Sequence, residues 1–208
     1  MSTIAVVDYG LCNIDSVVRA LEECGGSAVV THTKEDIERA ARIVIPGVGS
    51  FCDAMGNLHE NGLIDVLRDA ALKRKVPFLG ICLGMQLLAT TGTEGGKSEG
   101  LGLIEGEVVL MERDSPQTRI PHVGWNEVKV ARSSPLLEGV PDGSDFYFVH
   151  SYHLRPVREE DVIARTPYCG GFASVVGREN VFGAQFHPEK SQTMGFRLLK
   201  NFLALPLP

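Results

Sequence analysis

The chain has 208 residues, enough for one domain that buries roughly 70% of its unfolded surface without disulfide or metal support. Its formal net charge is −6 and its basic residues do not cluster, which argues against nucleic acid or an anionic membrane as a partner. Hydrophobic residues make up 44% and charged residues 22%, as in an ordinary globular protein, so we expect a single domain over residues 1–208.

The five cysteines lie far apart and form no CxxC pair: Cys12, Cys24, Cys52, Cys82 and Cys169. An odd number at such spacings argues against a disulfide framework or a zinc site, and we expect neither a metal nor another cofactor. Free thiols are typical of a reducing compartment. Residues 1–10 have neither the charge pattern of a secretory signal nor the length of a membrane span, so we expect a cytoplasmic protein.

The first hundred residues alternate between β-branched apolar runs and helical periodicity. Strands are predicted at 3–10, 27–33, 42–51 (ending at Pro46) and 76–81. Helices are predicted after Asn13, which can cap the first of them, over 35–41, over 61–73 and from residue 83 onward. This alternation is typical of parallel βαβ units, in which functional residues gather at the carboxyl ends of the strands.

After residue 100 the segments are strand-like, with few helices between them: 102–111, 122–131, 145–156, 161–168, 172–178 and 181–189. A last helix is expected over roughly 192–204. We therefore predict an α/β fold with an open, mostly parallel central sheet flanked by helices. Extra antiparallel strands from the C-terminal half are expected at the sheet edge or in a small side sheet.

Residues 80–84 read Gly-Ile-Cys-Leu-Gly, where a predicted strand turns into a predicted helix. In Gly-x-nucleophile-x-Gly, the glycines permit a tight turn that holds the nucleophile above the sheet. The N-terminus of the following helix then favours the thiolate of Cys82. This segment alone leaves open the alternative of a buried structural cysteine.

A nucleophile needs a base, and His187 is the best candidate. Glu189 lies two residues further along an extended segment, so both side chains point the same way and the carboxylate can orient the imidazole. An isolated His-x-Glu is more often a surface pair, but together with the elbow it predicts a Cys-His-Glu triad. Oxyanion donors are expected from the N–H of Leu83 and from Val48 and Gly49 in PGVG, which could also be an ordinary glycine loop.

These segments, PGVGSF (46–51), GICLGMQ (80–86) and HPE (187–189), together resemble the class I (triad-type) glutamine amidotransferases, which have a flavodoxin-like fold. Within that family, further segments resemble the glutaminase subunits of imidazole glycerol phosphate synthases: DYGLCNIDSV (8–17), PHVGWNEV (121–128), YFVHSYH (147–153) and HPEKSQ (187–192). The resemblance spans almost the whole chain. One departure is Cys12, which stands where the family pattern DYGxGN has its second glycine.

By this resemblance, Cys82 attacks the side-chain amide of glutamine, His187 transfers protons and Glu189 orients His187. The ammonia passes to a partner cyclase, a (β/α)₈ barrel in a heterodimer with this chain, which makes imidazole glycerol phosphate and AICAR in histidine biosynthesis. The positions that match substrate-binding ones are Gln86, Glu94, His150, Ser151 and Tyr152. Those that match the cyclase-facing surface are Asn13, Trp125, Asn126, Tyr147 and Lys190.

Simpler interpretations of several of these residues remain open. His150 could be a packed strand histidine, Trp125 a core residue and Lys190 a solvated charge. Other functions are a glutaminase subunit of anthranilate or pyridoxal phosphate synthase, a cysteine peptidase or esterase-like hydrolase, and a non-catalytic binding module. The segment Lys190-Ser191-Gln192 together with HVGWN favours the first assignment, and the complete triad argues against a non-catalytic module.

Overall fold

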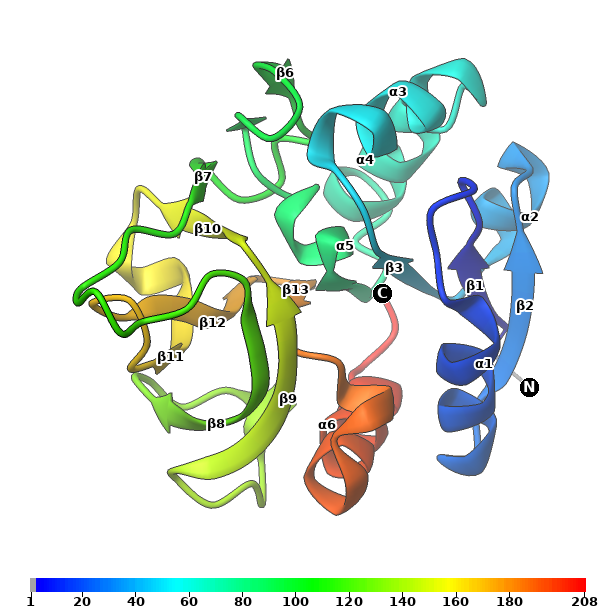
Figure 1. Cartoon of the computed structure of the whole chain (residues 1–208). Helices are drawn as coiled ribbons and strands as arrows, with labels where there is room; N and C mark the ends of the chain where they lie inside the picture. Colours follow the sequence, from blue (N-terminus) through cyan, green and yellow to red (C-terminus); the bar gives the residue numbers. More distant parts are fainter. Residues whose placement is uncertain (1–2) are drawn as a thin grey trace.

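The computed structural model describes residues 3–208 as an α/β protein built around a large twisted sheet (Figure 1). Its strands follow the order β2-β1-β3-β4-β13-β12-β11-β8-β9. The first five are parallel: β2 (Ser27–Thr31), β1 (Thr3–Val7), β3 (Arg42–Gly47), β4 (Phe78–Cys82) and β13 (Val181–Ala184). The others pair antiparallel: β12 (Phe172–Arg178), β11 (Val162–Thr166), β8 (His122–Val130) and β9 (Ser144–His150).

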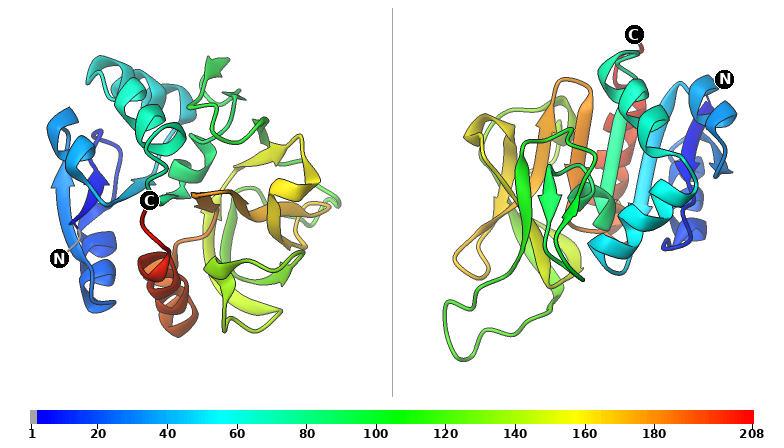
Figure 2. Two further views of the ribbon diagram at one scale, coloured as in Figure 1. Left: turned by 180° about the vertical axis from the view of Figure 1, so that it is seen from behind. Right: turned by 90° about the horizontal axis from the view of Figure 1, so that it is seen from above.

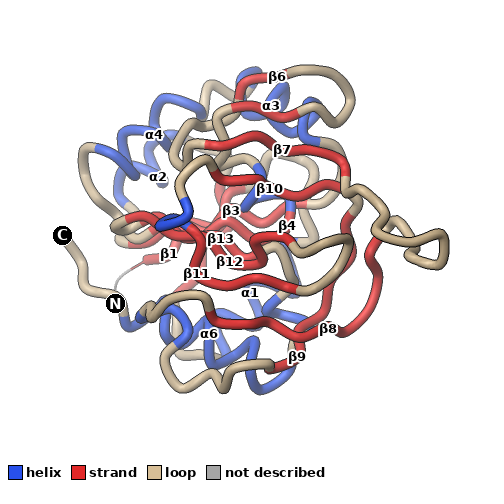
Figure 3. The backbone as a smooth tube through the Cα atoms, turned by 90° about the vertical axis from the view of Figure 1, so that its left-hand side faces the viewer, coloured by secondary structure: helices blue, strands red, loops and turns tan. Residues whose placement is uncertain are grey.

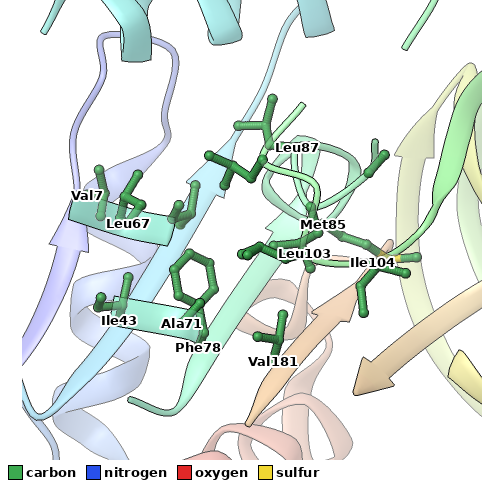
Figure 4. Close-up of a cluster of buried hydrophobic side chains, with 14 of the residues drawn as sticks. Val7, Ile43, Leu67, Ala71, Phe78, Met85, Leu87, Leu103, Ile104 and Val181 are labelled. Carbon is green, nitrogen blue, oxygen red and sulfur yellow. The ribbon is translucent and has the colours of Figure 1, made fainter. Parts of the chain in front are cut away.

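Helices cover both faces of the parallel part, as Figures 1 and 2 show. One face packs on α2 (Lys34–Arg39), α3 (Phe51–Glu60), α4 (Ile64–Leu72) and the single turn α5 (Leu83–Gln86). The other packs on α1 (Ile14–Glu23), α6 (Gln192–Ala204) and the 3₁₀ turn η1 (Pro135–Leu137). Successive residues of each buried strand alternate between these two cores, which is why the strands are apolar throughout. Figure 4 shows the first core, with Phe78 and Ile43 of the strands against Leu67 and Ala71 of α4.

A smaller sheet lies beside the large one, with the order β10-β7-β5-β6. Its strands are β10 (Tyr152–Pro156), β7 (Gly106–Leu110), β5 (Thr91–Gly92) and β6 (Ser98–Glu99). In Figure 3, β6 lies against α3 and β10 passes close to the large sheet. Two further 3₁₀ turns are η2 (Glu159–Asp161) and η3 (Pro188–Lys190). The predicted antiparallel additions therefore occur both at the sheet edge and in a side sheet.

Most predicted elements are confirmed, and the helix over 192–204 is α6. One helix is missing from the prediction, α3, although Phe51, Ala54, Met55 and Leu58 have helical spacing and Ser50 accepts a capping hydrogen bond from the backbone N–H of Asp53 at 3.3 Å. The predicted strand 145–156 breaks at residue 151, so that β9 and β10 lie in different sheets.

Two smaller details also differ from the prediction. The third strand continues one residue beyond Pro46, to Gly47. Asn13 occupies the N-cap position of α1, but its side chain makes no capping hydrogen bond. The loop between β7 and β8 stands out from the body (Figure 2, right). None of the helices in residues 3–208 combines the length and hydrophobicity that a membrane crossing requires.

Candidate active site

Cys82 lies where β4 turns into α5, near the middle of the molecule (Figure 1). Its backbone has φ 55° and ψ −111°, an unusual conformation for a residue with a side chain. Strain of this kind persists only where the surrounding packing imposes it. The helix that follows has only four residues, so the helix dipole behind the sulfur is weaker than the sequence led us to expect.

The two glycines around Cys82 are required because backbone segments approach each other closely. A Cβ at Gly84 would overlap the carbonyl of Ile45 in β3, and a Cβ at Gly80 would overlap the carbonyl of Gly84. The turn therefore closes directly against the neighbouring strand, with no room for side chains. This packing explains why a lone cysteine sits between two glycines at this point of the sequence.

His187 and Glu189 follow β13, the strand next to β4, so the topology carries them to the same edge of the sheet as Cys82. Nδ1 of His187 lies 2.7 Å from Oε1 of Glu189, and the side chains are 3% and 1% exposed. The backbone N–H of His187 donates to the carbonyl of Tyr147 at 2.9 Å. The hydroxyl of Ser191 donates to the carbonyl of His187 at 2.6 Å, which fixes the turn after the histidine.

The electrostatics of His187 reflect its two neighbours. Burial lowers its pKa, but the sulfur of Cys82 and the carboxylate of Glu189 outweigh burial and raise the pKa to about 10. Nε2 has no hydrogen-bond partner among residues 3–208 and is buried. A proton on Nε2 is thus stabilised by the surrounding negative charge, and this nitrogen is free to exchange a proton with a reacting group.

A pocket of about 200 Å³ opens beside Cys82. It is lined by Val48, Gly49, Cys82, Leu83, Gln86, Glu94, Val149, His150, Ser151 and Tyr152. All the residues predicted to bind substrate and all the predicted oxyanion donors therefore meet at one pocket. Burial raises the pKa of Glu94, whose Oε2 accepts a hydrogen bond from the backbone N–H of Phe51 at 3.2 Å.

Gln185 is a residue of this site that the sequence reasoning missed. Its Nε2 donates to the sulfur of Cys82 at 3.8 Å, and its Oε1 accepts a hydrogen bond from Nε2 of Gln86 at 3.2 Å. The side chain is fully buried. The only signal in the sequence is an amide within the apolar run that leads to His187, since buried polar groups require partners.

The segment Val48-Gly49 lines the pocket, but the N–H of Val48, one of the expected oxyanion donors, is hydrogen-bonded elsewhere. The backbone N–H of Val48 donates to the carbonyl of Leu11 at 2.8 Å. Two residues earlier, the carbonyl of Pro46 accepts hydrogen bonds from the hydroxyl of Tyr9 at 2.8 Å and the thiol of Cys12 at 3.4 Å. The loop after β1 thus holds this segment on two sides.

Three of the residues predicted to face a partner, Trp125, Tyr147 and Lys190, lie together at the outer face of β8 and β9. Trp125 is 49% exposed and packs edge to face on Tyr147, with 6.1 Å between ring centroids. Nζ of the exposed Lys190 lies 5.9 Å from the centroid of the Tyr147 ring. The cross-strand neighbours Val123 and Val149 add exposed apolar surface. Trp125 is therefore not a core residue.

Asn126 and Asn13 are not part of this group. The side chain of Asn126 hydrogen-bonds the buried His122 on the opposite face of β8 from Trp125, and Asn13 is exposed at the start of α1. Within residues 3–208, no cluster of three or more histidine, cysteine or acidic side chains could hold a metal ion.

Several known proteins are similar to this chain in sequence. The model of the family "Glutamine amidotransferase class-I" matches residues 5–205. The imidazole glycerol phosphate synthase subunit HisH of Moorella thermoacetica is 48% identical, over 97% of this chain and 94% of the relative. Subunit HisH 1 of Campylobacter jejuni (strain RM1221) is 46% identical, over 97% of this chain and 100% of the relative.

Solved structures agree in fold. The structure of PurLQS from Thermotoga maritima has a TM-score of 0.76 at 20% identity and covers 97% of both chains. A structure described as a glutamine amidotransferase has a TM-score of 0.73 at 24% identity and covers 96% of both. The chain is thus a member of the class-I glutamine amidotransferase family of enzymes, and within it of the HisH subunits of imidazole glycerol phosphate synthase.

Proposed function

We propose that this chain is the glutaminase subunit of an imidazole glycerol phosphate synthase, working as one unit over residues 1–208 in the cytoplasm. The observation that carries the proposal is the strained Cys82 at the end of β4, next to the His187–Glu189 pair. Identities of 46–48% with HisH proteins over almost the whole chain support this synthase over the anthranilate and pyridoxal phosphate synthases.

The reaction is acyl transfer through a thioester. The sulfur of Cys82 attacks the side-chain carbonyl carbon of glutamine, while His187, which holds the proton given up by the thiol, passes it to the departing nitrogen. Ammonia leaves and a glutamyl thioester remains. Water then attacks the thioester with His187 as general base, which releases glutamate and restores the thiol. Glu189 orients the ring through Nδ1 and stabilises the imidazolium, as the 2.7 Å contact suggests.

The tetrahedral intermediate needs two N–H donors. We assign the N–H of Leu83 as one, since it directly follows the nucleophile. The second comes from the segment Val48-Gly49, which lines the same pocket. Because the N–H of Val48 is bonded to Leu11, the segment must reorient before it can serve. We infer that this reorientation follows loading of the partner, so that glutamine is not hydrolysed idly.

The pocket suits a small polar substrate. Its volume of about 200 Å³ is below the range usual for drug-sized ligands, which favours free glutamine over a peptide or a large ester. Glu94 is placed to bind the substrate's amino group. The amide of Gln86 and the segment Ser151-Tyr152 surround the remaining polar groups.

The partner is a cyclase of the (β/α)₈ barrel type, forming a heterodimer with this chain and converting the ammonia into imidazole glycerol phosphate and AICAR. We place it on the surface formed by Trp125, Tyr147 and Lys190, and we propose that it extends to Asn13 and to the backbone of β8 at Asn126. Aromatic residues and a cation on an exposed apolar face are favourable for association. This surface adjoins the triad, because Lys190 follows Glu189 and the carbonyl of Tyr147 accepts the N–H of His187. Ammonia released at Cys82 therefore has a short path to the partner.

The test is glutamate release from glutamine by the purified chain, alone and together with a cyclase and its nucleotide substrate. We expect little activity from the chain alone and strong activity in the loaded complex. Equal activity with and without the cyclase would support the triad but contradict the proposed partner. No activity under either condition, with the Cys82→Ala variant as the blank, would contradict the proposed function.

A further inference from the structure

Two histidines outside the triad form a buried hydrogen-bond chain. His122 on β8 and His150 on β9 are paired across the strands and are 3% and 7% exposed. Nδ1 of His122 lies 3.1 Å from Nε2 of His150. Nδ1 of His150 lies 2.9 Å from the carbonyl oxygen of Tyr152, and Nε2 of His122 lies 3.2 Å from Nδ2 of Asn126.

The direction of every hydrogen bond in this chain is determined. A backbone carbonyl only accepts, so Nδ1 of His150 donates to Tyr152 and its Nε2 accepts. His122 must then donate from Nδ1 and accept at Nε2. At the other end, the backbone N–H of Glu127 donates to Oδ1 of Asn126 at 2.9 Å, which turns the amide nitrogen toward His122. Both ends therefore require the same arrangement.

This arrangement requires neutral rings, and the surroundings keep them neutral. Burial lowers the pKa of His122 to about 4 and that of His150 to about 3. His122 is stacked between Phe148 and Tyr168, with centroid distances of 4.8 and 4.0 Å, and His150 meets the edge of Phe172 at 4.9 Å. Aromatic packing therefore holds the two rings in place, in addition to the hydrogen bonds between them.

The end of this hydrogen-bond chain at the carbonyl of Tyr152 is part of the active site. The carbonyl of Tyr152 also accepts a hydrogen bond from Nε2 of Gln86 at 2.9 Å. The other N–H of that amide donates to Oε1 of Gln185 at 3.2 Å, and Gln185 donates to the sulfur of Cys82 at 3.8 Å. Both donor positions of Gln86 are thus used, and its orientation depends on where the Tyr152 carbonyl lies.

We propose that His122 and His150 are positioning residues of the glutaminase site: by donating in one direction, from β8 to β9 to Tyr152, they hold the carbonyl that orients Gln86 and, through it, Gln185 at Cys82. The substrate in this inference rests on the proposed function, and the two histidines extend that function. In this proposal both rings act through Tyr152 and Gln86, and His150 also lines the pocket beside Cys82. His150, expected from the sequence as a substrate-binding residue, has both ring nitrogens engaged in the chain.

Two substitutions at one position separate this role from a merely structural one. His122→Phe keeps an aromatic ring between Phe148 and Tyr168 but leaves Nε2 of His150 without its donor. His122→Asn places an amide N–H close to the position of Nδ1 and restores that donor. The matched control is His153→Phe, which replaces a neighbouring imidazole whose Nδ1 has no hydrogen-bond partner within residues 3–208.

In the complex with a loaded cyclase, we expect His122→Phe to lower kcat/KM for glutamine roughly 10-fold, mainly through KM, because a misoriented Gln86 weakens substrate positioning. His122→Asn should recover most of this loss, and His153→Phe should match the wild type.

A second measurement on the isolated protein needs no glutaminase activity. The rate at which iodoacetamide alkylates Cys82 should fall severalfold in His122→Phe and recover in His122→Asn.

The outcomes distinguish this inference from the proposed function. If the wild type hydrolyses glutamine and His122→Phe does so equally well, with unchanged alkylation, the inference is overturned and the function stands. If the wild type is inactive with the cyclase, the proposed function is contradicted. The inference is then tested by alkylation alone, and an unchanged alkylation rate in His122→Phe would overturn it. If His122→Phe does not fold, ¹H–¹⁵N spectra of the histidine-labelled full chain decide. We expect protons on Nδ1 of both rings, and a proton on Nε2 of either ring would overturn the direction of the chain.

Discussion

The backbone N–H of Val48 donates a hydrogen bond to the carbonyl of Leu11, with 2.8 Å between the nitrogen and the oxygen. This contact joins the loop after β1 to the segment that we expect to stabilise the oxyanion. As long as it persists, the N–H of Val48 is directed away from the pocket beside Cys82. We therefore propose that the loop after β1 controls how readily the oxyanion site becomes complete.

Gly49 allows a direct test of that control. Its φ is +106°, and a Cβ there would meet nothing closer than Leu11 at 3.8 Å, so Gly49→Ala adds backbone strain without a clash. A non-glycine residue in such a conformation costs about 1–3 kcal/mol, which disfavours the present arrangement. We expect the unstimulated rate to rise and the stimulation by the loaded cyclase to fall roughly 10-fold, measured as the ratio of kcat values.

Gly25→Ala is the matched control for this prediction. Gly25 has φ +90° and nothing within 4 Å of a Cβ, so the substitution imposes a similar strain in the turn between α1 and β2, at the opposite end of the parallel strands from Val48. Its stimulation ratio should equal that of the wild type. An unchanged ratio in Gly49→Ala as well would show that the segment does not reorient.

Cys12, which replaces the glycine of the family pattern, adds to the same restraint. Its thiol donates to the carbonyls of Pro46 at 3.4 Å and Val7 at 3.7 Å. Burial raises the pKa of Cys12, so the group remains a thiol and keeps its donor. We expect Cys12→Ala to raise glutamate release by the chain alone a few-fold. Cys24→Ala, which removes a similar contact to the carbonyl of Phe196 at 3.6 Å, should have no effect. A lower rate in Cys12→Ala would contradict this account.

The buried histidines predict acid sensitivity of the fold. The pKa values of His122 and His150 in the folded state, about 4 and 3, lie below the unfolded value of 6.5. The unfolded chain therefore binds more protons below pH 6.5, so the stability contribution is fully present above pH 6.5 and is lost as the pH falls toward 4. Urea unfolding should show a loss of up to about 2 kcal/mol per histidine between pH 7 and pH 5. His122→Phe should lose about half as much, and an equal loss would exclude His122 as a source.

His187 acts in the opposite pH range. Its pKa is raised to about 10, above the unfolded value, so its contribution is fully present below pH 6.5 and declines as the pH rises toward 10. It therefore does not add to the acid loss. Stability should be greatest near neutral pH, between the ranges in which the two groups of histidines titrate.

The close packing of the elbow predicts opposite effects for two glycine substitutions. Gly84→Ala drives a Cβ into the carbonyl of Ile45, and we expect a loss of about 4 kcal/mol or more in the free energy of unfolding. Gly56 lies within α3 with nothing within 4 Å of a Cβ, so Gly56→Ala should stabilise by about 0.5–1 kcal/mol. Denaturant unfolding of both variants measures the difference. A well-folded Gly84→Ala chain would mean that the turn is less crowded than described.

Local sequence patterns were sufficient for much of this fold. Apolar runs indicate the buried strands, and helical periodicity indicates α6. The glycines on either side indicate the turn at Cys82, because its packing against Ile45 leaves no room for side chains there. Helix α3 is absent from the prediction because the segment after Pro46 is interpreted as a glycine loop, although Ser50 and the spacing from Phe51 to Leu58 indicate a helix.

Contacts that depend on distant pairing could not be predicted from local patterns. The hydrogen-bond chain that runs from Asn126 through the two histidines to Tyr152 exists only because β8 pairs with β9. Gln185 reaches Cys82 only because β13 lies beside β4. The direction of the Val48 N–H depends on a loop more than thirty residues earlier, near Leu11. No window of sequence contains both partners of these contacts.

The central claim is that Cys82 is the nucleophile that attacks glutamine. The most direct test incubates the loaded complex with the glutamine analogue 6-diazo-5-oxo-L-norleucine, which alkylates glutaminase nucleophiles, and maps the adduct by peptide mass spectrometry. We predict one adduct, on the peptide containing Cys82, with loss of glutamate release in proportion to labelling and no adduct in the folded Cys82→Ala variant. Labelling of another residue, or full glutaminase activity in Cys82→Ala, would contradict the claim.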